Sequence, residues 1–354
     1  MKERGPVTVL FLCRGSLDNG IGHVTRSRTV AKAMHNIGRV TLAAIGDDYV
    51  DNLLMGHGVD YTVLSRDDEV MPFVKSIAPD VVIFDLTFID PVQFASIASG
   101  RLTVSLSPVF NCIAEVDMLF HRTDAVDPGW EFAPDRPVVR KGLDYAVVSD
   151  HCHCIEESVY WQSIKSDNLS IAVTMGGTDA SNKTFRVLET IKEMTDPLLI
   201  WALLGEGYSH SYEKLVDRIK GSRHEVILAK TTHSMWRILN TCSLAIVAGG
   251  TTTYEAAYVG LPSLNMLDSP RQRFLIRELV DRGVCTCLGD TFDESLAELN
   301  PTLTRLNRYR EELFAMHLHS RGLIDGRAAA RIADEILLTY YRRIYGESAD
   351  GVGC

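Results

Sequence analysis

The sequence predicts an α/β protein in which two doubly wound domains follow one another, face a central cleft and are completed by a long C-terminal helix. Three observations support this prediction. The chain has 354 residues, which is more than one hydrophobic core usually serves. Short apolar runs alternate with helix-like segments, and this alternation restarts after Asp167. In each series, a glycine-containing turn directly follows the first apolar run.

The apolar runs are rich in Val, Ile and Leu without polar alternation, which is typical of strands covered by helices on both faces of a parallel sheet. The first series is VTVLFLC at 7–13, VTLAAIG at 40–46, VVIFD at 81–85 and LTVSLS at 102–107. The second is LSIAVTM at 169–175, LLIWALLG at 198–205, EVILAK at 225–230, LAIVAGG at 244–250 and PSLNML at 262–267. Helical periodicity predicts helices over 22–35, 182–193 and 326–345.

A polar stretch near 148–168 marks the expected domain boundary. We therefore expect a first Rossmann-like domain over 1–150, a second over 151–325, the terminal helix over 326–345 and a flexible tail over 346–354.

Charge and composition exclude several classes of protein. The 36 basic and 46 acidic residues give a net charge of −10, which opposes a broad electrostatic contact with nucleic acid or an anionic membrane. No run reaches the roughly 18 apolar residues of a membrane span. The opening residues lack the apolar core of a signal peptide, so we expect a cytoplasmic protein. The segment HCHC at 151–154 lacks the spacing of a zinc site, and no metal site is expected.

The segment NGIGHVTRS at 19–27 opens the first expected helix. Glycines at such a turn let the backbone approach a ligand, and a helix N-terminus offers free N–H donors to an anion. Gly20, Gly22 and Arg26 are therefore candidate ligand contacts. His23 would point into the cleft, where an imidazole can act as a general base. A structural, hydrogen-bonding histidine is the alternative.

Two similar turns occur in the second series, MGGTDASN at 175–182 and AGGTTTYEAA at 248–257. Glycine amides, hydroxyl groups and a following helix suit a diphosphate. The candidate contacts are Gly176, Gly177, Thr178, Asp179 and Asn182 in the first turn, and Gly249, Gly250, Thr251, Thr252 and Thr253 in the second.

Glu255, one turn further along the helix, could accept hydrogen bonds from both hydroxyl groups of a ribose. Capping roles remain open for the same segments. Asp179 or Asn182 could cap one helix, and Thr251 could cap the other with Glu255 as an acid of its first turn.

Two further sites follow expected strands. Asp85 ends the run VVIFD, where open α/β sheets often place catalytic or sugar-binding carboxylates, and Asp90 follows it as a second carboxylate with a capping role equally open. Arg271 and Gln272 follow the last core strand and could reach a sugar or phosphate, although solvent exposure is the simpler expectation for Arg271.

Taken together, these segments resemble the GT-B superfamily, and within it the group that contains the UDP-sugar hydrolase of pseudaminic acid biosynthesis and the spore-coat polysaccharide protein SpsG. The similarity is collinear and rests on IGHVTR at 21–26, VVIFD at 81–85, KGLDYAVV at 141–148, MGGTDASN at 175–182 and AGGTTTYEAAYVGLPSL at 248–264. The chain departs from the family where SPRQR at 269–273 replaces a common Asn-Gln, and where the connection 108–140 is longer.

The resemblance implies a GT-B enzyme of polysaccharide biosynthesis that needs no cofactor and uses a UDP-sugar as its substrate. The first domain would carry the acceptor side and the base His23, and the second would hold UDP through Gly249 to Thr253 and Glu255. The implied chemistry is a metal-independent single displacement with inversion at the anomeric carbon.

Three functions remain open at this point. In a glycosyltransferase, an acceptor hydroxyl group attacks the sugar, and the long segment 108–140 would contact that acceptor. In a hydrolase, the same base activates water. The third possibility is a non-catalytic protein that binds sugar nucleotides. An epimerase would need a second acid/base set, and the sequence assigns none.

Overall fold

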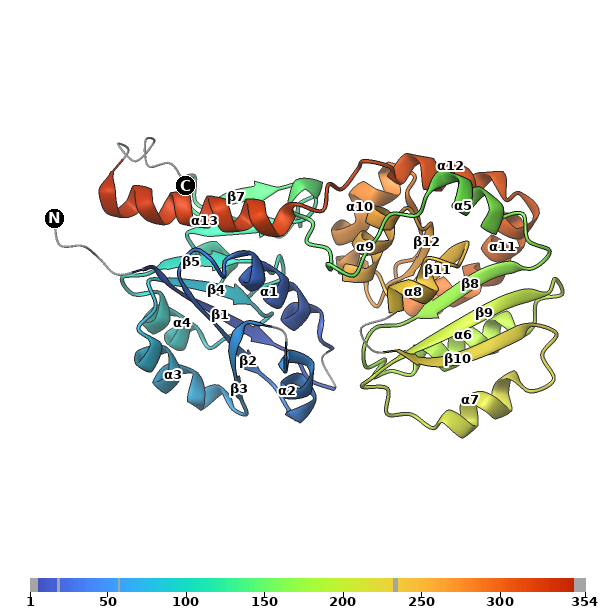
Figure 1. Cartoon of the computed structure of the whole chain (residues 1–354), viewed down its shortest axis with the longest axis horizontal. Coiled ribbons are helices and arrows are strands. Elements are labelled where there is room, and N and C mark those ends of the chain that lie inside the picture. Colours follow the sequence, from blue (N-terminus) through green and yellow to red (C-terminus); the bar gives the residue numbers. More distant parts are fainter. Residues whose placement is uncertain (1–5, 18–19, 57, 232–234, 347–354) are drawn as a thin grey trace.

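The computed structural model describes residues 6–17, 20–56, 58–231 and 235–346, and the expected tail beyond 346 lies outside these ranges. Two separate parallel sheets form the molecule, one per domain (Figure 1). The first sheet has seven strands in the order β3 (Asp60–Leu64), β2 (Arg39–Ile45), β1 (Thr8–Arg14), β4 (Val81–Asp85), β5 (Leu102–Ser105), β6 (Met118–His121) and β7 (Val138–Lys141).

Helices cover both faces of the first sheet, which explains its continuous apolar strands. Along β1, Val9, Phe11 and Cys13 face one core, whereas Leu10 and Leu12 face the other. The first core is completed by α1 (Gly22–Ala33) and α2 (Asp48–Leu54), and the second by α3 (Val70–Ile77) and α4 (Pro91–Ala98).

The second sheet has six parallel strands in the order β10 (Glu225–Thr231), β9 (Leu198–Gly205), β8 (Leu169–Thr174), β11 (Leu244–Val247), β12 (Ser263–Met266) and β13 (Cys285–Gly289). Its helices are α5 (Glu157–Ser163), α6 (Lys183–Ile191), α7 (Tyr212–Ile219), α8 (Met235–Leu239), α9 (Thr251–Val259), α10 (Arg273–Asp281), α11 (Phe292–Arg308) and α12 (Glu311–Ser320). The prediction of two doubly wound domains is therefore confirmed.

The long C-terminal helix is also confirmed, as α13 (Ala328–Tyr345). The chain leaves the second domain before α13, and this helix lies along the first domain (Figure 1). Ile332, Ile336 and Tyr340 pack with Val30 and Met34 of the α1 region in one apolar core. The first domain is thus built from both ends of the chain.

Candidate active site in the cleft between the domains

A cavity of about 480 Å³ lies between the domains, within the range of small-molecule sites. Both domains line it with the turns that follow their first strands. The first contributes Gly20, Ile21, Gly22, Thr25, Arg26, Arg28 and Tyr49, and the second contributes residues 174–181, Lys183, Trp236, Gly250, Thr251, Thr252, Glu255 and Asp268, among others.

The turns of the two domains approach each other closely. A Cβ atom added to Gly177 would lie 3.0 Å from the side chain of Ile21 in the other domain. One added to Gly22 would lie 3.6 Å from the Thr251 hydroxyl oxygen. A side chain at Gly177 would therefore have to displace the Ile21 side chain by a few tenths of an ångström.

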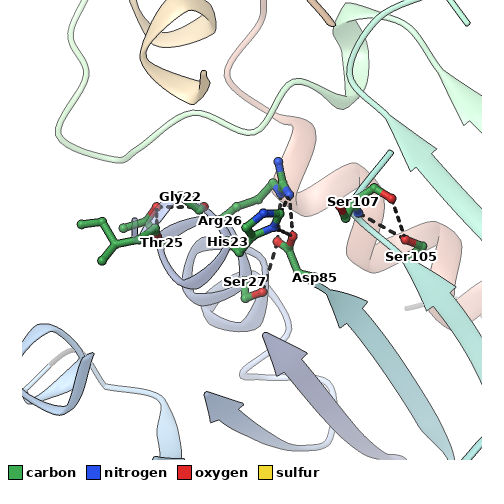
Figure 2. A network of polar contacts seen from close by, with 9 residues as sticks. Gly22, His23, Thr25, Arg26, Ser27, Asp85, Ser105 and Ser107 are labelled. Carbon is green, nitrogen blue, oxygen red and sulfur yellow. Dashed lines mark hydrogen bonds and ion pairs between the residues drawn. The ribbon is translucent and has the colours of Figure 1, made fainter. Parts of the chain in front are cut away.

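A partly exposed His23 and a buried Asp85 form a dyad at the N-terminus of α1 and the carboxyl end of β4 (Figure 2). The His23 Nδ1 atom lies 2.6 Å from Asp85 Oδ1. Arg26 donates from Nε to Asp85 Oδ2 at 2.9 Å and from Nη2 to Oδ1 at 2.5 Å. Ser27 donates its hydroxyl proton to Oδ2 at 3.2 Å. Asp85 thereby holds three side chains of one helix.

The charge of Asp85 determines which nitrogen of His23 carries the proton. Burial by itself would raise the pKa of Asp85, but Arg26 and His23 outweigh burial and hold this pKa below its ordinary value. Because Asp85 is an ionised acceptor, the neutral form of His23 donates from Nδ1 and carries its lone pair on Nε2. The side chain of His23 is 26% exposed and that of Asp85 is fully buried.

The described cavity is lined by Gly22, Thr25 and Arg26 beside His23, whereas His23 and Asp85 themselves lie outside its lining. Asp85 therefore orients His23 through its Nδ1 atom and does not itself reach the cavity. Asp90 has a different place, since its carboxylate caps α4 by accepting from the Gln93 N–H at 3.0 Å.

The turn at 175–182 combines cavity lining with helix capping. Asp179 accepts from the N–H groups of Lys183 at 2.7 Å and Thr184 at 2.9 Å, so it occupies the first two backbone donors of α6. Asn182 accepts from the Tyr208 hydroxyl group at 2.8 Å and does not line the cavity. The other four candidates of this turn, Gly176, Gly177, Thr178 and Asp179, do line it.

The turn at 248–255 leaves its helix end free. Helix α9 begins at Thr251 after Gly250, which has no side chain to cap it, and no other side chain in the described ranges is seen to do so. The expectation that Thr251 is the N-cap is therefore wrong, because Thr251 is already the first helical residue. Thr253 donates to Asn265 at 2.5 Å inside the domain, and neither Thr253 nor Gly249 lines the cavity.

Glu255 lies on the second turn of α9, so the alternative that it is a first-turn acid is also wrong. Its side chain is buried and lines the cavity, where it accepts hydrogen bonds from the Ser149 N–H at 3.2 Å and from the Trp236 side chain. Burial raises the pKa of Glu255 to about 7 despite these two hydrogen bonds. An acceptor held in this way suits a ligand with vicinal hydroxyl groups.

This raised pKa predicts how stability depends on pH in the ligand-free protein. A carboxyl group with its pKa raised from 4.5 to about 7 stabilises the fold below pH 4.5, and this contribution is lost as the pH rises through about 7. A pKa difference of this size between the unfolded and folded states corresponds to ~3 kcal/mol in the free energy of unfolding. We expect Glu255→Gln to remove this dependence in urea unfolding between pH 5 and pH 8, while exposed Glu213→Gln keeps it. A Glu255→Gln curve that is parallel to the wild-type curve would contradict this expectation.

Arg271 and Gln272 lie outside the cavity lining. Arg271 is 76% exposed and pairs with Asp127 of the first domain at 3.1 Å. Gln272 accepts from the Asp268 N–H at 2.8 Å. Both residues therefore shape the loop that follows β12, while Asp268, which the sequence analysis did not select, lines the cavity.

The long segment 108–140 packs against α10 of the second domain. Glu278 of α10 accepts from the Thr123 hydroxyl group at 3.1 Å and from the Asp124 N–H at 2.8 Å. Trp130 packs edge-on against Phe274 of the same helix, with ring centroids 6.0 Å apart. None of the described residues of this segment lines the 480 Å³ cavity.

Several cavity residues escaped the sequence analysis, among them Arg28, Tyr49, Lys183, Trp236 and Asp268. Lys183 and Asp268 directly follow a glycine turn and a strand, so the rule that ligands bind at strand ends could have identified them. No sequence motif marks Arg28, Tyr49 or Trp236 as ligand contacts, because only the folding of the chain brings them to the cleft.

Within the described ranges, no group of three His, Cys, Asp or Glu side chains could hold a metal ion. In the segment 151–154, Cys152 is buried and Cys154 is exposed. No helix of the described residues is long and apolar enough to cross a membrane.

No protein-family model matches the chain. Two curated proteins are similar to the chain in sequence. The uncharacterized protein MJ1062 of Methanocaldococcus jannaschii is 21% identical over 350 residues, 96% of this chain and 68% of that protein. The spore coat polysaccharide biosynthesis protein SpsG of Bacillus subtilis is 24% identical over 203 residues, 55% of this chain and 56% of SpsG.

Solved structures match over nearly the full length. HepE of Anabaena, in complex with UDP and glucose, has a TM-score of 0.65 at 14% identity, covering 94% of this chain and 100% of HepE. MurG of Acinetobacter baumannii has a TM-score of 0.64 at 16% identity, and the match covers 94% of this chain and 99% of MurG. The UDP-GlcNAc 2-epimerase of Neisseria meningitidis has a TM-score of 0.60 at 13% identity, and the match covers 94% of this chain and 99% of the epimerase. The chain thus has the GT-B fold, and its expected resemblance to SpsG is confirmed.

Proposed function

We propose that this chain is a glycosyltransferase that takes a UDP-sugar as its donor and transfers the sugar with inversion. The observation that carries this proposal is the His23–Asp85 dyad, at 2.6 Å, beside a cavity lined by the glycine turns of both domains. Structures of HepE with UDP and glucose, and of an epimerase with UDP-GlcNAc, have the same fold. No cofactor or metal ion takes part in the proposed reaction.

The diphosphate would bind at the uncapped N-terminus of α9. Gly250, Thr251 and Thr252 line the cavity there, and the first N–H groups of a helix attract an anion. The first two donors of α6 are already occupied by Asp179. Glu255 would then accept from the ribose, and the sugar would extend towards Gly20, Gly22 and Arg26 of the first domain.

His23 would act as the general base through Nε2. An acceptor oxygen attacks the anomeric carbon and loses its proton to Nε2, while the bond from that carbon to the β-phosphate oxygen breaks and its electron pair leaves with UDP. Asp85 stabilises the imidazolium that forms, since it remains ionised beside Nδ1. The helix end at Thr251 stabilises the departing diphosphate.

A nucleotide screen tests the donor site. We expect UDP to raise the melting temperature more than GDP, CMP, dTDP or ADP. CMP lacks the second phosphate, dTDP lacks the ribose 2′-hydroxyl group, and the structures of the same fold named above hold UDP or UDP-GlcNAc. Glu255→Ala should remove the UDP shift, and His23→Ala should keep it. If none of the nucleotides stabilises the protein, the proposal fails, and a protein without transferase activity becomes the better account.

Hydrolysis is the second candidate, and the position of segment 108–140 favours it. This segment is bound to α10 through Glu278 and Trp130 and does not line the cavity, so it offers no acceptor contact there. Steady release of UDP without an acceptor would identify water as the nucleophile. Release that starts only when an acceptor is added would identify a transferase, and an isomeric UDP-sugar among the products would identify an epimerase.

A further inference from the structure

Lys183 is the cation of the second domain at the cavity. Among the described lining residues from that domain, it is the only Lys or Arg, whereas four lining residues are acidic, Asp179, Glu206, Glu255 and Asp268. Lys183 is the first residue of α6, directly after the turn at 175–182. A lysine side chain is rarely buried without a charged ligand or partner to compensate its lost hydration.

The ammonium group of Lys183 is held at the cavity by one ion pair. Its Nζ atom lies 2.5 Å from Asp268 Oδ1, and the Lys183 side chain is 12% exposed while that of Asp268 is 50% exposed. The ring centroid of Phe292 lies 5.5 Å from the same Nζ atom. Because Asp268 is half-exposed while Lys183 is largely buried, water can solvate Asp268 if the pair breaks, whereas Lys183 then needs another negative partner.

We propose that Lys183 binds the diphosphate of the donor and stabilises its charge as the bond to the sugar breaks. This inference rests on the proposed function and adds a catalytic residue to it. The incoming diphosphate replaces Asp268 as the partner of Lys183, since phosphate oxygens at the α9 N-terminus face the same cavity. The electron pair of the broken bond ends on the β-phosphate oxygen, where the ammonium group offsets the new charge.

The test compares Lys183→Met with Lys183→Arg and Asp268→Asn. UDP and uridine binding are measured by calorimetry, turnover by UDP release, and folding by circular dichroism. We expect Lys183→Met to weaken UDP binding ~10-fold without changing uridine binding, and to lower kcat ~100-fold. Lys183→Arg should retain more of the UDP affinity and more of the kcat than Lys183→Met does. Asp268→Asn should tighten UDP binding, because it removes the carboxylate that competes for Lys183.

The two variants that break the same ion pair thus give opposite shifts in UDP affinity. If Lys183→Met and Asp268→Asn change stability and UDP affinity alike, the pair is only structural and the inference is overturned. If the wild-type protein binds UDP and turns over a UDP-sugar but Lys183→Met does so equally well, Lys183 is excluded while the proposed function stands. If the wild-type protein binds no UDP, both fall.

Discussion

Replacement of His23 by alanine is expected to lower nucleotide-sugar turnover by about 10²–10⁴-fold, the usual contribution of a general base. The physical reason is the dyad geometry. Asp85 fixes the Nδ1 proton, so the lone pair on Nε2 is the group that can take a proton from the nucleophile. Rates of UDP release at saturating donor measure the effect.

The matched control is His35→Ala. His35 is exposed after the end of α1 and has no place in the cleft, so its loss should leave turnover unchanged. UDP affinity should survive His23→Ala, because the donor contacts that we propose lie in the second domain. Turnover of folded His23→Ala within threefold of wild type would exclude His23 as the base.

Replacement of Asp85 by alanine is expected to destabilise the first domain by about 3–5 kcal/mol, the cost of breaking a buried ion pair. Asp85 is fully buried, and its loss leaves the Arg26 guanidinium, which is 9% exposed, without a compensating charge. Urea unfolding at pH 7 measures the change. The exposed pair Arg66–Asp68 offers the control, since Asp68→Asn should leave the urea midpoint almost unchanged.

Acid should reveal the same interaction. The pKa of Asp85 is lowered because Arg26 and His23 outweigh its burial, so its stabilising contribution is present above the unfolded value of about 3.9 and is lost as the pH falls through the lower, folded value. The stability difference between wild type and Asp85→Ala should therefore shrink below about pH 4. A difference that stays constant down to pH 2 would show that Asp85 contributes by packing alone.

Asp85→Asn separates orientation from charge. The amide keeps the shape of the carboxylate, but its N–H group can donate to His23 Nδ1, which would place the ring proton on Nε2. We therefore expect turnover to fall while UDP binding persists. Equal turnover in wild type and Asp85→Asn would show that the tautomer of His23 does not matter to the reaction.

Local sequence determined most of the central strands and the order in which they follow one another. Long apolar runs and glycine turns identified the central strands of both sheets, because burial on two faces requires continuous apolar residues. The same reasoning missed β3, β6, β7 and β13. Strand β7, with the sequence VVRK, is the edge of its sheet and is largely exposed, so it carries little apolar signal.

The sequence by itself also determined the candidate turns, since a glycine turn between a strand and a helix is a local pattern. Only the tertiary structure decided which of their groups are free. Asp179 accepts from the first two backbone donors of α6, and Thr253 donates to Asn265 inside the domain. Glu255 is buried and accepts from the backbone N–H of Ser149, which lies between the two domains in the sequence. Which partners a group meets, and how much water it keeps, depends on residues distant in the chain, and a local pattern carries neither.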